Sequence, residues 1–469
     1  MSVVPGSVAV VGGGIAGLTA AHRLHARGAQ VTVIEADDRL GGKLRTSAFA
    51  GRLVDEGADA FLLRVPWALE LCRELGIAGE LVNPSTRNAY VYNRGELRPL
   101  PPQLMGVPTD LDAVAAAGHL SDEGLDRLRD DLTLGPTPPG TDDESIAAVI
   151  GRRLGEEALN RLVDPLVGGI NAGDTRRLSL RAVVPQLDSA SRDAARPSLV
   201  EACRALLAGA APTADGPVFA APAAGMERLV RGLTSALGGV TVRLGRRVEA
   251  LEPPNSAGRH VLHLDDGTAV DADAVILAVP PHAAAPLLRA AAPAGADLVV
   301  VIEHASVAIV TLAVRPGDIG RPLDASGFLV PRVERTALTA CSWTSTKWAH
   351  LDPEHGDGTV VLRASVGRHG GDRAFDLDDD DLVALVLDDL ALTMALTGAP
   401  TEVRLSRWPQ GFPQYAPGHL ERIDAVERDL PRSLALAGAG MQGVGVPACI
   451  RSGEDAAQRV AGHIQAACA

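Results

Sequence analysis

The chain has 469 residues, of which 46% are hydrophobic and 22% are charged. This composition is typical of a globular protein and argues against a disordered one, and the length corresponds to about three domain-sized units. The formal net charge of -14, without any lysine-rich or arginine-rich run, excludes an extended surface for a nucleic-acid backbone.

The cysteine pattern and the first residues of the chain indicate in which cellular compartment the protein is expected. Five cysteines are spread along the chain without a Cys-x-x-Cys pair, so neither a metal site nor a redox pair is predicted, and a cytoplasmic location is expected. The first apolar run begins by Val8, which leaves no room for a signal peptide. Prolines and charged residues interrupt the apolar stretch 274–302, so no transmembrane helix is predicted. Peripheral contact with a membrane stays open.

The N-terminal motif indicates dinucleotide binding. An apolar run at residues 8–11 is typical of a buried parallel strand, and residues 15–27 are expected to follow as a helix. Three glycines between them match G-x-G-x-x-G: the first allows a tight turn, the second lets the backbone approach a pyrophosphate, and the third lets the helix pack on the strand. The helix N-terminus offers free amides to the anion. The expected contacts are Gly12, Gly14, Ile15, Ala16 and Gly17.

A second apolar run, residues 31–34, ends in a glutamate about where a ribose ligand is expected. That glutamate opens the pattern E-x-x-x-R-x-G-G-K-x-x-T, which resembles the second fingerprint of FAD-binding, amine-oxidase-like flavoproteins. The resemblance implies that the basic residue after the paired glycines helps to neutralise the phosphates. That residue is usually arginine in the family and is lysine here. The expected contacts in this segment are Glu35, Ala36, Arg39, Gly42 and Lys43.

The middle of the chain points to a narrower family. Residues 161–180 read RLVDPLVGGINAGDTRRLSL, in which a helix is expected to break at Pro165 into a glycine-containing loop. This segment closely resembles one found in protoporphyrinogen oxidases and bacterial coproporphyrinogen III oxidases. Further segments similar to that family are 54–77, 298–314, 326–331, 407–420 and the C-terminal GVGVPACIRSG, so the resemblance covers residues 8 to 455.

The resemblance also implies where cofactor and substrate lie. The loop before a predicted helix at 66–76 is expected at the flavin, with Ala58 where the family commonly has proline. Arg64 is expected to pair with a propionate of the substrate through charge-assisted hydrogen bonds. The flavin loop comprises Gly57, Ala58, Asp59 and Ala60; one cavity wall comprises Gly169, Ile170 and Asn171, and the opposite wall Gly327, Phe328 and Leu329.

Three distant segments are expected to complete the FAD site. Residues 239–251 alternate like an edge strand, and residues 273–281 read as a buried strand ending in prolines. Residues 435–453 read as a strand, a glycine-rich loop and the start of a last helix, whose amides would stabilise negative charge on the reduced flavin. The expected contacts are Val248, Trp408, Val444, Gly445 and Val446.

The predicted fold class is therefore α/β, with a discontinuous Rossmann-like FAD domain, a mixed α+β substrate domain and a helical lobe. The predicted FAD domain comprises residues 1–84, 219–286 and 401–469; the substrate domain 85–104, 205–218 and 287–400; and the lobe 105–204.

The activity that the resemblance implies is an FAD-dependent, oxygen-using oxidation of a porphyrinogen in haem biosynthesis, with release of hydrogen peroxide. Coproporphyrinogen III is the favoured substrate and protoporphyrinogen IX the alternative; no side-chain base is assigned. Amine oxidation is disfavoured because residues 306–315 contain no lysine and only 3% of the chain is aromatic. Carotenoid desaturation is disfavoured too, and a porphyrin-binding flavoprotein without turnover is the alternative from another class.

The expected partners are a small-molecule porphyrinogen and molecular oxygen, with transient contact to other haem-pathway enzymes and no nucleic acid. No metal is expected. The acidic run 376–382 lacks the glycine of a calcium loop, and it suits the first turn of a helix at 381–396. His22 and His25 have no third ligand in view.

Overall fold

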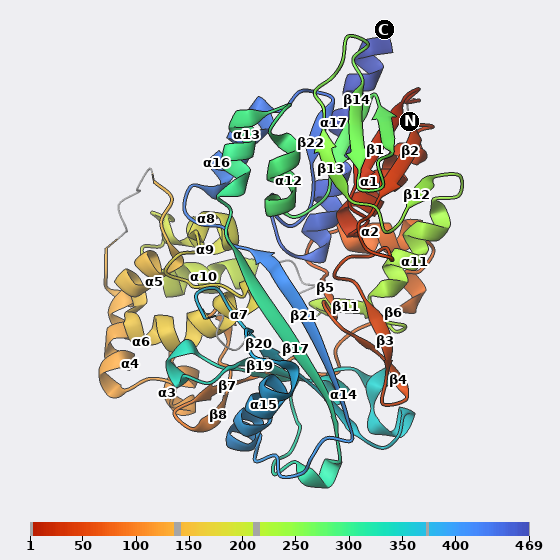
Figure 1. Cartoon of the computed structure of the whole chain (residues 1–469). Helices are drawn as coiled ribbons and strands as arrows, with labels where there is room; N and C mark the ends of the chain where they lie inside the picture. Colours follow the sequence, from red (N-terminus) through yellow and green to blue (C-terminus); the bar gives the residue numbers. More distant parts are fainter. Residues whose placement is uncertain (1–2, 136–141, 210–215, 372–374, 469) are drawn as a thin grey trace.

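The computed structural model describes residues 3–135, 142–209, 216–371 and 375–468. Figure 1 shows a sheet near the two chain termini, a second sheet at the opposite end of the molecule, and a helical lobe beside them.

The sheet near the termini has five strands, and every neighbouring pair is parallel. It confirms the buried strands expected at 8–11 and 31–34, and it collects strands from distant parts of the chain because apolar runs of this kind need cover on both faces. In sheet order the strands are β12 (Thr241–Arg243), β2 (Gln30–Ile34), β1 (Ser7–Val11), β16 (Ala274–Leu277) and β22 (Leu434–Leu436).

Alternate side chains of these strands pack on opposite faces. Val8 and Val10 contact the helical layer formed by α1, α2, α11 and α17, whereas Ala9 and Val11 contact a layer of helices and a three-stranded antiparallel sheet. The first layer is α1 (Ile15–His25), α2 (Trp67–Glu74), α11 (Glu227–Ala236) and α17 (Val446–Cys468); the second is α12 (Pro281–Leu288), α13 (Pro293–Val300), α16 (His419–Asp429), β13 (Val248–Leu251), β14 (His260–Leu264) and β15 (Ala269–Ala272).

Residues 239–251 do not form the single edge strand that their alternation predicts. They form β12 in the parallel sheet and β13 in the antiparallel one. Gly245 lies between them at φ +60°, a conformation that suits glycine and turns the chain from one sheet to the other.

The second sheet has seven strands, and α15 (Asp379–Met394) covers one of its faces. The long strand β21 pairs with β17, so residues 402–413, which the sequence groups with the FAD domain, form the edge of this sheet. Conversely, α13 packs on the parallel sheet, although the sequence groups residues 287–300 with the predicted substrate domain. In sheet order the strands are β21 (Glu402–Pro413), β17 (His304–Val314), β20 (Val360–Val366), β19 (Leu338–Trp343), β18 (Gly327–Leu329), β7 (Tyr90–Asn93) and β8 (Glu96–Pro99).

The helical lobe has its own apolar core. The helix expected to break at Pro165 instead continues to Asn171. It widens over residues 159–168 into a π-helix, and such widening accommodates a residue that cannot donate the regular helical hydrogen bond. The lobe contains α3 (Leu111–Ala117), α4 (Asp122–Arg129), α5 (Ile146–Leu154), α6 (Glu156–Ala158), the π-helix η3 (Leu159–Gly168), α7 (Gly169–Asn171), α8 (Leu180–Val183), α9 (Pro185–Ser191) and α10 (Leu199–Gly209).

Short elements connect these parts. The strands are β3 (Thr46–Phe49) with β4 (Arg52–Asp55), β5 (Phe61–Leu62) and β6 (Leu81–Val82) on either side of β11 (Phe219–Pro222), and β9 (Gln103–Leu104) with β10 (Val107–Pro108); the helix α14 spans Thr344–Lys347. The single-turn 3₁₀ helices are η1 (Ala78–Glu80), η2 (Asp130–Leu132), η5 (Pro316–Asp318), η6 (Arg332–Glu334), η7 (Ala349–Leu351) and η8 (Pro353–His355). Among the helices described, none combines the length and the apolar character needed to cross a bilayer.

Candidate cofactor and substrate site

The glycine loop between β1 and α1 contains two glycines that packing requires and one that packing does not. A Cβ on Gly12, which has φ +106°, would lie 2.5 Å from the Ala278 carbonyl oxygen, and a Cβ on Gly17 would lie 2.0 Å from the Gly12 oxygen. A Cβ on Gly14 would meet nothing within 4 Å. The middle glycine therefore faces open space at the N-terminus of α1, where Ile15 and Ala16 begin the helix and a phosphate would meet free amides.

Glu35, at the end of β2, stabilises this loop through hydrogen bonds of its side chain. Its Oε2 accepts a hydrogen bond from the Gly13 amide at 2.6 Å, and its Oε1 accepts one from the Asp37 amide at 2.9 Å. The neighbouring Ala36 is exposed. The Arg246 amide donates to the Glu35 carbonyl, which brings the start of β13, including Val248, to the same edge.

The second fingerprint packs directly on the first. The Gly41 amide donates to the Gly13 carbonyl at 2.8 Å, and a Cβ on Gly42 would lie 3.4 Å from the Gly14 Cα. Arg39 donates to the Gly42 carbonyl at 2.5 Å, so its guanidinium holds the turn in shape. The two glycine motifs, about 25 residues apart in sequence, therefore form one surface.

Lys43 directly follows the two glycines of the second fingerprint. Its side chain is accessible to solvent, yet desolvation by the surrounding protein lowers the pKa of its ammonium. The ammonium donates to the Gly411 carbonyl and lies 5.8 Å from the Phe412 ring centroid. Within the described ranges no carboxylate forms an ion pair with it. A desolvated cation without an acidic partner, next to an open glycine loop, fits the diphosphate of FAD.

The C-terminal segment lies against the start of α1 and near Lys43. A Cβ on Gly453 of α17 would lie 2.2 Å from the Ala16 oxygen, so α17 packs tightly on α1. Cys449, one turn into α17, is close enough to Lys43 for the ammonium to lower the pKa of its thiol, although burial dominates and raises that pKa to about 11. The loop residues Val444 and Gly445 are partly or fully exposed, and Val446 begins the helix.

The loop 57–60 joins the fingerprints to the seven-stranded sheet. A Cβ on Gly57 would lie 2.2 Å from the Lys43 carbonyl oxygen and 3.3 Å from the Trp408 ring. Trp408 also donates from its indole nitrogen to the Glu56 carbonyl at 3.1 Å. Ala58, Asp59 and Ala60 are partly accessible.

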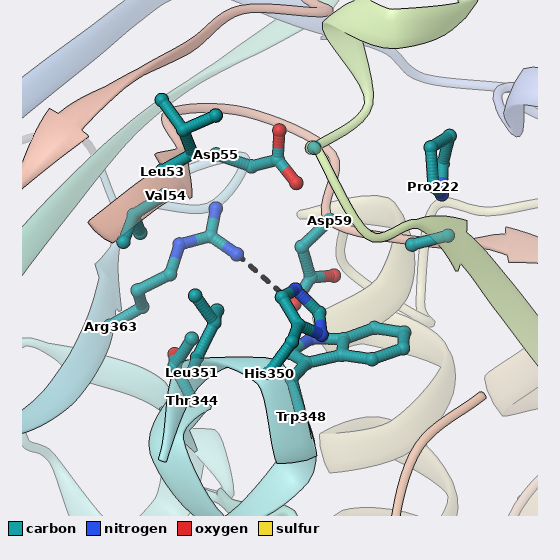
Figure 2. Close-up of a pocket in the computed structure, with 12 residues that line it drawn as sticks. Leu53, Val54, Asp55, Asp59, Pro222, Thr344, Trp348, His350, Leu351 and Arg363 are labelled. Carbon is teal, nitrogen blue, oxygen red and sulfur yellow. Dashed lines mark ion pairs between the residues drawn. The ribbon is translucent and has the colours of Figure 1, made fainter. Parts of the chain in front are cut away.

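Asp59 forms ion pairs that sequence reasoning missed. Its carboxylate lies 2.8 Å from Lys347 Nζ and 3.1 Å from an Arg363 guanidinium nitrogen, as Figure 2 shows for the arginine. Two signals could have found these partners: Lys347 is one of only two lysines in the chain, and Arg363 interrupts the apolar strand VVLRASV.

The cavity drawn in Figure 2 is lined in part by Asp59 of this loop and is too small for a substrate. Its volume of about 10 Å³ corresponds to roughly one water molecule. Asp55 lies at its edge, and burial raises the pKa of this carboxyl to about 6 despite hydrogen bonds from Thr46 and the Met226 amide.

Of the two predicted substrate walls, residues 169–171 and residues 327–329, only some residues face each other. A Cβ on Gly169 would lie 3.7 Å from a Leu329 methyl group, so these residues face each other. Ile170 is exposed, and the Asn171 side chain turns back to donate to the Val167 carbonyl.

Strand alternation turns Phe328 away from this interface, and its ring packs against Trp343 at 6.3 Å in the core beneath α15. Phe328, expected in one cavity wall, therefore does not face Gly169 across this contact. Gly327 has a packing role, because a Cβ there would lie 2.1 Å from the Cys341 oxygen.

Arg64 lies in the turn between β5 and α2, exposed and unpaired with any residue that the structure describes. It is therefore available to an anionic ligand. In the described ranges no group of three or more histidine, cysteine, aspartate or glutamate side chains is arranged to hold a metal ion.

Comparison with known proteins gives one family and a consistent set of relatives. Residues 15–461 match the family of flavin-containing amine oxidoreductases. The coproporphyrinogen III oxidase of Bacillus subtilis (strain 168) is 34% identical over 470 residues, covering 96% of each chain. That of Mycobacterium tuberculosis (strain H37Rv) is 37% identical over 450 residues, covering 95% of each. The chloroplastic protoporphyrinogen oxidase 1 of Arabidopsis thaliana is 26% identical over 96% of this chain and 87% of its own.

Solved structures agree on the fold. A candidate protoporphyrinogen oxidase from Exiguobacterium sp. 255-15 superposes with a TM-score of 0.86 and 30% identity, covering 98% of this chain and 100% of its own. Cyclohexylamine oxidase from Brevibacterium oxydans gives a TM-score of 0.71 at 20% identity, covering 98% and 99%; this second likeness concerns the fold alone.

Proposed function

Since this chain belongs to the family of flavin-containing amine oxidoreductases, we propose that it oxidises coproporphyrinogen III to coproporphyrin III with FAD as cofactor. The chain is a flavin-dependent oxidoreductase with the α/β fold of that family. The proposed reaction removes six electrons in three two-electron rounds, and each round reduces one O₂ to one H₂O₂. The product is the aromatic porphyrin.

The choice of substrate is supported by the near full-length similarity to proteins named coproporphyrinogen III oxidase, at 34% and 37% identity. Protoporphyrinogen IX is the second candidate, because a plant protoporphyrinogen oxidase matches 96% of the chain at 26% identity. An amine substrate is less well supported. The chain has no lysine in β17, the strand in which amine oxidases of this superfamily usually carry one near the flavin.

The proposed cofactor contacts follow from the open side of the glycine loop. Gly14 and the first amides of α1 would receive the diphosphate, with Lys43 supplying a compensating charge. Glu35, at the end of β2, would face the ribose. FAD, when bound, accepts the hydride removed from a C–H bond of the substrate. The amides around Val446 would then stabilise negative charge at the ring.

The residues proposed to contact the substrate are the cation Arg64 and the facing pair Gly169 and Leu329. Arg64 would pair with a propionate at the entrance, and Gly169 and Leu329 would confine the macrocycle near the loop 57–60. Positioning is the main contribution proposed for these residues, because hydride transfer needs the reacting atoms held about 3 to 3.5 Å apart. Pyrrole N–H groups can release their protons by tautomerisation, so the proposal assigns no side-chain base.

The substrate is proposed to be a small molecule taken up from the cytoplasm, with O₂ as the second substrate and transient contact with other haem-pathway enzymes. The test is to mix the purified yellow protein with each porphyrinogen in air and follow porphyrin fluorescence and H₂O₂. A heat-denatured sample corrects for spontaneous oxidation. Coproporphyrinogen III should give the higher kcat/KM. A higher kcat/KM for protoporphyrinogen IX would identify protoporphyrinogen IX as the preferred substrate instead. If neither porphyrinogen is oxidised, the proposed function is refuted.

A further inference from the structure

Two cations hold the loop 57–60: Arg363 on β20 of the seven-stranded sheet and Lys347 at the end of the short helix α14. Arg363 lies on β20, on the face opposite α15, because its neighbours Leu362 and Ala364 pack into the core beneath that helix. Its guanidinium reaches Asp59 at 3.1 Å and also donates to the Gly57 carbonyl at 2.5 Å. One arginine therefore binds both a side chain and the backbone of the loop.

Lys347 completes the arrangement from α14. Its ammonium donates to Asp59 Oδ2 at 2.8 Å, and only 18% of the lysine side chain and 22% of the aspartate side chain are exposed. Desolvation alone would raise the pKa of Asp59, but Lys347 and Arg363 outweigh it and hold that pKa well below its ordinary value. The carboxylate is therefore ionised and paired on both sides. Such partly shielded, charge-assisted pairs are stronger than exposed ones.

A continuous series of contacts connects these cations to the first glycine loop. Gly42 packs on Gly14, the carbonyl of Lys43 packs on Gly57, and Gly57 and Asp59 are held by Arg363 and Lys347. The chain contains only two lysines, and both belong to this series. The parallel sheet and the seven-stranded sheet thus meet through the loop that lies beside the open glycine face.

We propose that Lys347 and Arg363 are positioning residues that hold the loop 57–60, through Asp59 and the Gly57 carbonyl, at the distance from Gly14 that the flavin requires. This inference rests on the proposed function only in taking FAD as the ligand. Neither residue touches the reacting atoms. With FAD bound beside this loop, the two cations would also contribute positive charge near the flavin, so removing a cation and removing the Asp59 carboxylate should shift the flavin potential in opposite directions.

The test uses the full-length holoprotein and three variants: Lys347→Met, Asp59→Asn and the double variant. Lys347→Met should weaken FAD binding by roughly tenfold, as expected for loss of one partly shielded charge-assisted hydrogen bond. It should also lower the flavin midpoint potential, because a positive charge that favours the reduced form is gone. Asp59→Asn leaves two uncompensated cations and should raise the potential. The double variant should return toward the wild-type potential.

Two controls separate positioning from general stability. Arg161→Met removes an ion pair with Glu334 that is 2.7 Å long, similarly shielded and far from the loop in sequence, and it should leave both flavin measurements unchanged. Lys347→Arg restores the charge and should recover most of the affinity. If Lys347→Met fails to fold, Arg363→Lys, which keeps the charge but loses the fork between Asp59 and Gly57, gives the same measurement of affinity.

Unchanged FAD affinity and potential in Lys347→Met and Asp59→Asn would overturn the inference, as would shifts of the same sign in both variants. A wild-type protein that binds FAD but leaves both porphyrinogens unoxidised would refute only the proposed substrate. A wild-type protein that takes up no FAD would overturn both.

Discussion

The carboxylate of Glu35 accepts a hydrogen bond from the Gly13 amide, with 2.6 Å between Oε2 and the nitrogen. Because Glu35 ends β2 and Gly13 follows β1, this contact ties the glycine loop to the neighbouring strand. The second carboxylate oxygen is occupied by the Asp37 amide. The glutamate therefore shapes the loop before any ribose is present.

Replacing Glu35 tests this role. Glu35→Ala loses both amide contacts and should weaken FAD binding by roughly tenfold or more, since hydrogen bonds to a charged acceptor are among the stronger ones. Glu35→Gln keeps one oxygen but turns an NH₂ group toward the other amide, so it should be intermediate. Fluorescence titration of the apoprotein with FAD measures both. Equal affinity in all three proteins would contradict the assignment.

The glycine loop gives a paired prediction. Gly14→Ala should leave the thermal stability of the apoprotein nearly unchanged, because the new Cβ meets no protein atom within 4 Å, but it should abolish tight FAD binding by occupying the cofactor's space. Gly17→Ala should destabilise the apoprotein itself, since its Cβ would lie 2.0 Å from a backbone oxygen. Melting curves with and without FAD distinguish the two. A stable Gly14→Ala protein that binds FAD normally would show that the diphosphate lies elsewhere.

Lys43 should act through its charge. Lys43→Met removes the desolvated ammonium and should weaken FAD binding, with less dependence on salt than in the wild type. Lys43→Arg, which restores the residue usual in the family, should bind FAD about as well as the wild type. Titrations at two ionic strengths provide the measurement. If the methionine variant binds FAD as tightly as the arginine variant, the ammonium does not face the phosphates.

Arg64 should affect substrate binding more than chemistry. It is exposed and has no partner among the described residues, so its loss should cost little stability. Arg64→Ala should raise KM by about tenfold and lower kcat less, while Arg64→Lys should recover part of the loss. Steady-state kinetics with coproporphyrinogen III separate the effect on KM from the effect on kcat. An unaltered KM would show that another group receives the propionate.

His419 should make the fold sensitive to acid. It stacks on Tyr415 at 3.9 Å, and burial lowers its pKa to about 4 although the Met441 carbonyl favours the charged form. The unfolded chain takes up a proton near pH 6.5, before the folded one does, so this histidine reduces stability as the pH falls from about 6.5 to about 4. His419→Gln removes that loss. The difference in unfolding free energy between the two proteins should therefore shrink between pH 8 and pH 5, as denaturant titrations can show. A constant difference would contradict the low pKa.

Short-range patterns in the sequence predicted the elements that local sterics control. The strand at 8–11, the glycine turn and the helix start at residue 15 follow from side-chain periodicity and from conformations that only glycine adopts easily. The acidic turn before α15 is of the same kind: the Asp378 side chain caps the helix, which then spans Asp379–Met394. The resemblance to porphyrinogen oxidases likewise rests on short motifs, and the near full-length similarity to coproporphyrinogen III oxidases at 34% and 37% identity confirms it.

Other features depend on how distant segments pack. Nothing near Phe328 in sequence shows that α15 covers its side of the sheet, and nothing near Pro165 shows that the helix widens and continues. The strand β21 joins the seven-stranded sheet because β17 offers it a partner, whatever its neighbours in sequence do.

The sequence by itself determined that glycine turns follow two apolar strands and that a cation follows the second turn, because these choices depend on a few adjacent residues. Only the tertiary structure decided that Asp59 meets Lys347 across 288 positions of the chain. This partly shielded ion pair forms because the tertiary fold brings the loop 57–60 against α14, and no local pattern specifies that contact.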